Sequence, residues 1–130
     1  MIHFTYDPAL RVLFTTAEGP VSFAEIKHHL SRETSEGALP YRELFDASTA
    51  STDLTQHEVR ELAGQLSTLA KSATLGPTAI VTVNDMFFGM ARMFQILSEL
   101  RDGPLFGVYR KRDEALEWLL GIPPDPTRPG

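Results

Sequence analysis

Short hydrophobic runs of strand type alternate with longer amphipathic segments along this chain. Thr78–Val83, "TAIVTV", is rich in β-branched residues, and the segment that follows it, Met86–Arg101, has apolar residues at helical spacing. The same patterns predict further strands at 2–6, 10–14, 41–47 and 105–110, and further helices at 23–35, 55–69 and 113–121. Because alternating strands and helices are joined by crossover connections, we predict an α/β fold of order β-β-α-β-α-β-α-β-α. It has four helices and a mixed, mostly parallel sheet of about five strands.

The first two predicted strands flank Asp7-Pro8, a pair of residues that favours a tight turn. Proline presets one backbone angle of the turn, and the aspartate carboxylate can accept hydrogen bonds from nearby backbone N–H groups. We therefore expect an N-terminal β-hairpin whose first strand lies antiparallel at an edge of the sheet. Gly19-Pro20 is expected to end the second strand.

Two of the predicted helices begin with a capping-box pattern, in which residues three positions apart bind each other's free backbone N–H groups. Ser22 and Glu25 have this spacing at the first helix, and Thr55 and Glu58 have it at the second. Gly37 is the expected stop of the first helix, because glycine readily adopts the backbone conformation that ends a helix.

The length and composition are typical of one globular domain. The sequence has 130 residues, of which 42% are hydrophobic and 22% are charged. We assign 1–121 to a single α/β domain. The remaining segment, 122–130, contains four prolines and is predicted to be a flexible Pro-rich tail.

The charge and the residue types exclude several kinds of function. The net charge is −5, and the basic run at Arg110–Arg112 is followed directly by two acidic residues, so we expect no nucleic-acid binding. The absence of cysteine excludes disulfides, thiolate metal sites and a cysteine nucleophile. Neither a signal peptide nor a membrane span is predicted, which favours a cytoplasmic protein.

No strong catalytic or cofactor-binding motif occurs. The chain lacks the glycine-rich dinucleotide and phosphate loops and the nucleophile elbow. Its histidines lack the spacing of a zinc site and are interpreted as surface residues: His3, His28, His29 and His57. We therefore expect no enzyme activity, no metal and no cofactor. An active site would need polar groups that converge around Asp46 and Arg92.

The stretch 45–59, "FDASTASTDLTQHEV", is the most informative predicted connection. Asp46 ends a predicted strand, and ligands of parallel α/β sheets gather beyond the carboxyl ends of the strands. The start of the next helix offers free N–H groups that favour an anion. The candidate residues of this interaction or phosphoacceptor loop are Asp46, Ser48, Thr49, Ser51, Thr52 and Thr55. In the structural alternative, Asp46 satisfies loop backbone, Thr55 caps the helix and the other hydroxyls are solvated spacers.

The helix predicted at Met86–Arg101 is apolar around most of its circumference. Such a helix is usually buried, and in a small protein this burial can involve a second copy of the chain or an apolar ligand. The candidate ligand or dimer face comprises Met86, Phe87, Met90, Arg92, Met93 and Phe94. Close packing against a neighbouring element would explain Gly89. Arg92 either extends to water, binds an anionic ligand or forms a salt bridge, for which the candidate partners are Asp46, Asp53 and Asp85.

Four phrases of the sequence resemble the SpoIIAA-like proteins of the STAS superfamily. They are "DLTQHEVRELA" at 53–63, "GPTAIVTVND" at 76–85, "FGMARMFQ" at 88–95 and "FGVYRKRDEALEWL" at 106–119. This superfamily is named for sulfate transporters and anti-sigma-factor antagonists and is often linked with SEC14-type domains. The resemblance extends over 1–120 and implies a β/α superhelix, in which helices pack chiefly on one face of a mixed sheet.

The resemblance also implies a possible phosphorylation switch. In the antagonist proteins, a partner kinase phosphorylates a serine at the start of the helix after the central strand, and this decides which partner is bound. The corresponding helix starts here with Asp53-Leu54-Thr55, whereas the antagonists have a Ser-Ser-Gly type of start. The phosphorylated serine therefore has no equivalent by position.

Two hypotheses about function result from these patterns. The first is a non-enzymatic regulatory or interaction module of STAS type, which contacts a protein partner through the loop between the third strand and the second helix. The second is a binding module for a small apolar or amphiphilic, lipid-like ligand beside the Met/Phe-rich helix. A homodimer through that helix is a separate expectation.

Overall fold

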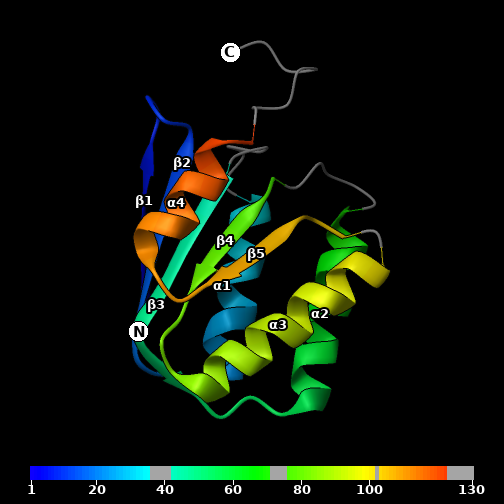
Figure 1. Ribbon diagram of the computed structural model, residues 1–130. Coiled ribbons are helices and arrows are strands. Elements are labelled where there is room, and N and C mark those ends of the chain that lie inside the picture. Colours follow the sequence, from blue (N-terminus) through cyan, green and yellow to red (C-terminus); the bar gives the residue numbers. More distant parts are fainter. Residues whose placement is uncertain (36–41, 71–75, 102, 123–130) are drawn as a thin grey trace.

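A computed structural model of the chain describes residues 1–35, 42–70, 76–101 and 103–122. Within these residues the chain forms five strands and four helices in the predicted order (Figure 1). The elements are β1 (Ile2–Asp7), β2 (Val12–Val21), α1 (Phe23–Ser35), β3 (Arg42–Thr52), α2 (Gln56–Ala70), β4 (Thr78–Val81), α3 (Asp85–Leu100), β5 (Phe106–Tyr109) and α4 (Arg112–Leu120). The predicted stop at Gly37 and most of the predicted tail lie outside the described residues.

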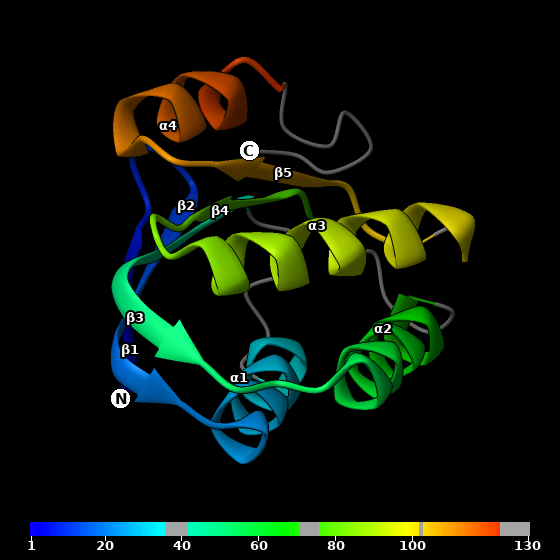
Figure 2. The same ribbon diagram turned by 60° about the horizontal axis from the view of Figure 1, so that its bottom comes forward.

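The strands lie side by side in the order in which they occur along the chain. β1 pairs antiparallel with β2, and β2, β3, β4 and β5 are parallel to one another. Right-handed crossovers between successive neighbours place every connecting helix on the same face of the sheet. Accordingly α1, α2 and α3 cover one face, and α4, which follows the last strand, covers the other (Figure 2). The predicted mixed α/β sheet and N-terminal hairpin are confirmed.

The two faces of the sheet have separate hydrophobic cores. The larger core combines Phe45 and Ile80 of the sheet with residues of α1, α2 and α3. The smaller core combines Leu44 and Val81 with Ala115 and Leu119 of α4. Because successive side chains of a strand point to opposite faces, β3 contributes to both cores at once. For this reason β3 has buried residues at consecutive positions. Such a run is usual for a strand that is covered on both faces.

The second and third strands extend further than predicted. We expected Gly19-Pro20 to end the second strand and Ala47 to end the third, but β2 continues to Val21 and β3 to Thr52. β1 pairs with β2 only as far as Ala17, so Pro20 lies beyond the hairpin at an open edge, where a missing N–H is tolerated. The extension is a two-stranded ribbon that pairs 18–21 with 49–52.

A β-bulge begins this ribbon. Ala47 and Ser48 of β3 lie opposite the single residue Ala17 of β2, because the pairing shifts between Thr16↔Asp46 and Glu18↔Thr49. The backbone N–H of Ser48 donates to Oδ1 of Asp46 at 3.0 Å. The carboxylate thus satisfies a backbone donor next to the irregularity in the ladder.

The helix starts agree well with the capping patterns. At α2 the Thr55 N–H donates to Glu58 Oε1 at 3.0 Å and the Glu58 N–H donates to Thr55 Oγ1 at 3.1 Å, which is the full reciprocal box. At α1 the Glu25 N–H donates to Ser22 Oγ at 3.2 Å. The Glu25 carboxylate lies 3.2 Å from the N-terminal ammonium group, so its charge also holds the start of the chain.

Candidate functional site

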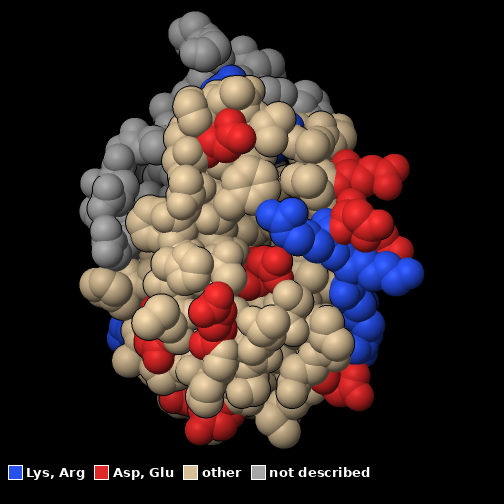
Figure 3. Space-filling view, turned by 90° about the vertical axis from the view of Figure 1, so that its left-hand side faces the viewer, with Lys and Arg blue, Asp and Glu red and all other residues tan. Residues whose placement is uncertain are grey.

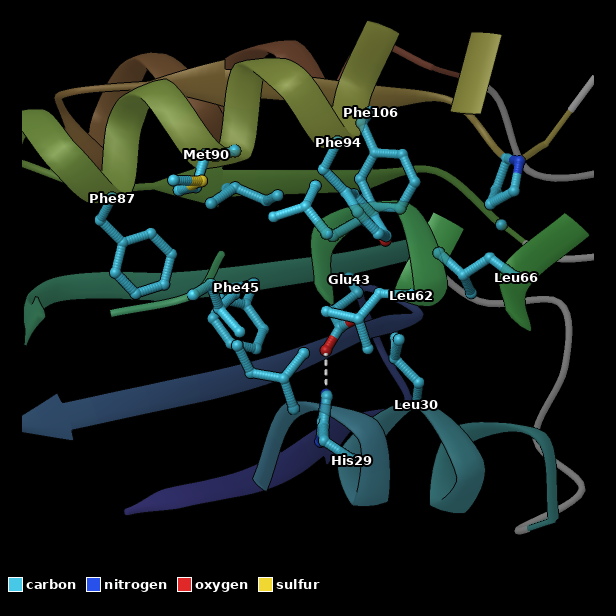
Figure 4. A pocket seen from close by; sticks show the side chains of 18 residues that line it. His29, Leu30, Glu43, Phe45, Leu62, Leu66, Phe87, Met90, Phe94 and Phe106 are labelled. Carbon is cyan, nitrogen blue, oxygen red and sulfur yellow. Dashed lines mark hydrogen bonds and ion pairs between the residues drawn. The ribbon is translucent and has the colours of Figure 1, made fainter. Parts of the chain in front are cut away.

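A pocket of about 100 Å³ lies between the sheet and the three helices α1, α2 and α3. Side chains from all of these elements point into the same space (Figure 4). Its described lining residues are Ile26, His29, Leu30, Glu43, Phe45, Leu54, Val59, Leu62, Leu66, Gly76, Thr78, Ile80, Phe87, Met90, Ala91, Phe94, Pro104 and Phe106. Among these residues only His29, Glu43 and Thr78 have polar side chains. An apolar pocket with a few convergent polar groups is typical of a small-molecule site.

The polar groups of the pocket form a buried hydrogen-bonded cluster. Oε2 of Glu43, on β3, accepts a hydrogen bond from Thr15 Oγ1 of β2 at 2.6 Å and lies 2.8 Å from His29 Nε2 of α1. The exposed fractions of His29 and Glu43 are both only 4%. Figure 4 shows the Glu43–His29 contact at the pocket wall. Taking a carboxylate out of water is costly unless donors replace the lost solvent. The Thr15 hydroxyl supplies one donor, and the Nε2-protonated form of His29 supplies a second.

The position of His29 corrects the sequence-based interpretation. We expected a surface histidine, but the ring is buried between two phenylalanines. Its centroid lies 5.8 Å from that of Phe4 and 5.7 Å from that of Phe45, both in edge-on geometry. These contacts fix the plane of the imidazole, so Nε2 is held towards Glu43. His28, the next residue along the helix, is exposed as expected.

Sequence spacing contained a signal for both residues. His29 is three residues after Ile26 and next to Leu30, and these positions share one face of a helix. Glu43 alternates with Phe45 and Ala47 in a strand that we had interpreted as an inner one. A charged residue at an inward position of an inner strand requires a partner, and His29 on the inward face of the preceding helix is that partner.

The residues predicted on the third helix are divided between the pocket and the surface. Phe87, Met90 and Phe94 line the pocket, and Met93 packs against the larger core. Met86 is 61% exposed. Gly89 is exposed too, and an added Cβ would meet no atom within 4 Å, so the close packing that we expected there is wrong.

Arg92 and Asp46 do not converge on a common site. Arg92 is exposed on α3, and its Nη1 donates to Gln95 Oε1 at 3.0 Å. Asp46 faces the side of the sheet that α4 covers, where Oδ2 lies 3.3 Å from Arg112 Nε. Asp85 is also paired, since its Oδ1 lies 2.9 Å from Arg110 Nη1. Of the three predicted partners of Arg92, two thus bind other arginines.

The predicted hydroxyl loop is a strand. Residues 48–52 belong to β3: Ser48 lies in the bulge, and 49–52 pair with 18–21 of β2 in the ribbon. Ser48, Thr49 and Ser51 are exposed. Thr52 is buried, where its Oγ1 donates to Val21 O at 2.9 Å and accepts from Leu54 N at 3.3 Å. Thr55 caps α2.

The surface charges are mixed. On the side shown in Figure 3, Lys and Arg side chains gather in one group towards the right-hand edge, and Asp and Glu side chains lie directly above and below this group. In the part of the chain that the structure describes, no three His, Asp or Glu side chains are grouped to hold a metal ion. Within the same residues, no helix has both the length and the hydropathy that crossing a bilayer requires.

The architecture is shared with a known structure. A crystal structure from Shewanella loihica PV-4, of an uncharacterised protein from the DUF3478 family with a SpoIIAA-like fold, superposes with a TM-score of 0.56 over 92% of this chain and 92% of that chain. This chain has a SpoIIAA-like fold. The two sequences are 17% identical, so the similarity is one of fold. No protein-family model matches this sequence, and no curated protein is significantly similar to it.

The SpoIIAA-like architecture agrees with the implied β/α superhelix, with three helices on one face of the sheet. In this fold the pocket lies beneath those three helices. Its walls come from segments as distant in sequence as Ile26 and Phe106. The site is therefore a product of the tertiary structure, and no local motif marks it.

Proposed function

We propose that this protein is a non-enzymatic binding module for a small, largely apolar ligand, held between the sheet and helices α1, α2 and α3. The observation that supports this function best is the pocket itself, with five large apolar side chains facing a space of about 100 Å³. These side chains are Phe45, Phe87, Met90, Phe94 and Phe106. An engineered apolar cavity of about 150 Å³ stays dry and binds benzene, so the expected ligand portion is about the size of one ring.

A pair of alanine substitutions tests this proposal. Ala91 lines the pocket and Ala24 is exposed on α1, so Ala91→Leu fills the pocket, whereas Ala24→Leu adds the same volume at the surface. Binding of benzene, followed by NMR shifts of the methyl group of Met90, should be saturable in the unchanged protein and in Ala24→Leu. It should be lost in Ala91→Leu. Equal binding by both variants, or no binding to the unchanged protein, would contradict a ligand pocket.

A regulatory module that binds a protein partner is the second proposal, and the exposed hydroxyls of β3 support it. Ser48, Thr49 and Ser51 lie on the ribbon beyond the sheet, where a kinase can reach them. A phosphate added there brings up to two negative charges. Asp46 and Asp53 are close in sequence, so the added charge would be repelled by like charges. Phosphosite mapping on protein from its native host should find modification at one of these three residues. Unmodified protein under all growth conditions would contradict a switch at this place.

A homodimer is supported by the outer side of α3. Met86, Ile96 and Leu100 are 61%, 50% and 76% exposed and recur at helical spacing with Gly89 and Met93. Apolar helix faces of this kind are common in protein interfaces. Sedimentation should show a concentration-dependent dimer that Ile96→Glu abolishes, while Glu99→Lys on the neighbouring polar side leaves it intact. A monomer at high protein concentration would refute the dimer.

We also propose a cytoplasmic location for this protein.

A further inference from the structure

The pocket is elongated along the helices α2 and α3. Its lining residues on α2 extend from Val59 to Leu66, and those on α3 extend from Phe87 to Phe94. Each of these spans covers about two helical turns, which is a length of ~10 Å. Both helices connect parallel strands and therefore run in the same general direction. Figure 4 shows Phe87 at one end of the pocket and Leu66 at the other.

The volume and the length of the pocket together favour a narrow ligand. An apolar cavity of about 150 Å³ binds one benzene ring. Here a smaller volume, about 100 Å³, is distributed over a length of ~10 Å. An unbranched alkyl chain suits such a space, because each of its methylene groups then contacts the walls. An extended chain advances ~1.2 Å per bond, so this length holds about eight carbons.

The polar lining residues gather at one end of the pocket. Thr78 begins β4 and pairs with Glu43 of β3, and Glu43 contacts His29. Because β4 leads from Thr78 towards the start of α3, this end lies away from Phe87. Gly76 and Thr78 are half-buried, so this end of the pocket borders solvent.

Apolar side chains close the opposite end. Leu54, Val59 and Phe87 lie there and are at most 7% exposed. A polar group placed among them would lose its hydrogen bonds to water without replacement. An amphiphile in the pocket therefore has one favourable orientation, with its apolar end at these residues and its head group at the solvent-bordered end.

Thr78 supplies a polar contact for such a head group. Glu43 and His29 are engaged with each other and Glu43 also with Thr15, whereas the Thr78 hydroxyl has no hydrogen-bond partner among the described residues. A threonine hydroxyl can both donate and accept a hydrogen bond. It therefore suits an uncharged head group such as an alcohol.

We propose that the pocket binds the unbranched alkyl chain of an amphiphile, about eight carbons long, with its hydroxyl at Thr78 and its terminal methyl group at Phe87. Medium-chain primary alcohols represent this class of ligand. The inference rests on the ligand-binding function proposed above, and it adds the shape and the orientation of the ligand.

The unbranched primary alcohols from butanol to decanol test the chain length, with affinities measured by NMR titration of the Met90 methyl group. Affinity should rise about fourfold with each added methylene, because burying one contributes about 0.8 kcal/mol. The rise should end at about eight carbons. Cyclohexanol should bind more weakly than hexanol, which has the same number of carbons. An affinity independent of chain length, a rise that continues to decanol, or tighter binding of cyclohexanol would overturn the proposal.

Nuclear Overhauser effects in the complex with octanol test the orientation without any substitution. The terminal methyl group of octanol should contact the ring of Phe87, and the carbon that bears the hydroxyl should contact the methyl group of Thr78. The reverse pattern, or contacts of each end with both residues, would contradict the proposed orientation.

Thr78→Val assigns the head-group contact, because valine keeps the shape and removes the hydroxyl. The affinity for octanol should fall about fivefold, the worth of a typical hydrogen bond, and the affinity for benzene should stay the same. Thr49→Val, at an exposed position of β3, is the matched control and should change neither affinity. An unchanged affinity for octanol in Thr78→Val would contradict the role of Thr78.

The outcomes also separate this inference from the proposed function. A protein that binds benzene without ranking the alcohols by length retains the pocket function and lacks the chain site. A protein that binds none of these compounds has neither.

Discussion

The ring of Trp118 on α4 occupies the space in which a side chain at Gly107 of β5 would begin. A Cβ atom built on Gly107 would lie 2.9 Å from Cζ3 of Trp118 and 2.8 Å from Cε2 of Tyr109. Both rings belong to the smaller hydrophobic core, between the sheet and α4. Glycine at this position therefore allows α4 to approach the sheet closely, which gives this residue a packing role and not a turn role.

Gly107→Ala should destabilise the protein. The added methyl group meets the rigid ring of Trp118, so α4 must shift or the indole must rotate, and overpacking of this kind costs about 1–3 kcal/mol. Urea unfolding followed by the fluorescence of Trp118 would measure the change directly. An unaltered midpoint would mean that α4 does not pack against β5 as described.

Gly89→Ala should have the opposite effect and serves as the matched comparison. Gly89 lies within α3, is exposed, and has no atom within 4 Å of an added Cβ. Alanine is favoured over glycine in a helix interior by about 0.8–1.0 kcal/mol. The melting temperature should rise by a few degrees, and calorimetry would show it. A decrease would indicate that another chain packs closely against this face, which is the dimer proposed above.

Removal of the buried carboxylate should be strongly destabilising. Glu43→Ala leaves His29 and Thr15 buried without the acceptor that they share, and breaking a buried pair in this way costs about 3–5 kcal/mol. The double variant His29→Leu, Glu43→Leu should lose less, because the Thr15 hydroxyl is then the one member of the cluster that loses its acceptor. A double-mutant cycle by chemical unfolding gives the coupling. Additive losses would show that the two side chains do not interact.

Asp46→Ala should destabilise the ribbon that β2 and β3 form beyond the sheet. The variant loses the acceptor of the Ser48 N–H at the bulge and the partner of Arg112, which together cost about 1–2 kcal/mol. Hydrogen exchange of the Ser48 amide should become faster. Asp53→Ala is the control, because Asp53 is exposed, and a surface substitution usually changes stability by less than about 0.5 kcal/mol. Equal effects would leave Asp46 without a special role.

Stability should fall at alkaline pH through Tyr109. Burial raises the pKa of the Tyr109 hydroxyl above its usual value of 10.0, and the negative charge of Glu114 raises this pKa further. The folded protein therefore holds the proton more tightly than the unfolded chain. The resulting stabilisation is complete below about pH 10 and is lost as the pH rises through the folded pKa. Tyr109→Phe should flatten the decline in melting temperature above pH 10, and an identical decline would refute this assignment.

Much of the fold follows from patterns that are local in the sequence. The capping box of Thr55 and Glu58 forms as predicted, because both partners lie within one turn of helix. The β-branched run at Thr78 is a central strand, flanked by β3 and β5. The ends of β2 and β3 were harder to predict. Gly19-Pro20 and the hydroxyl-rich segment 48–52 have turn-like composition, and only their pairing with each other makes them strands.

The candidate site was predicted only in part for the same reason. The apolar spacing of the third helix indicated that Phe87, Met90 and Phe94 could line a groove, and they do line the pocket. The division of that helix into an inner side and an exposed side depends on where α2 and the sheet lie. Arg92 and Met86 are exposed on the outer side of α3.

By itself the sequence determined the order of the elements, the starts of the helices and the parallel α/β arrangement. Periodicity and capping act over a few residues, so they can be read along the chain. The tertiary structure decided that Thr15, His29 and Glu43 share one oxygen in an apolar pocket. In the sequence His29 is 14 positions and Thr15 is 28 positions from Glu43. Only the packing of α1 over β2 and β3 removes the three side chains together from water.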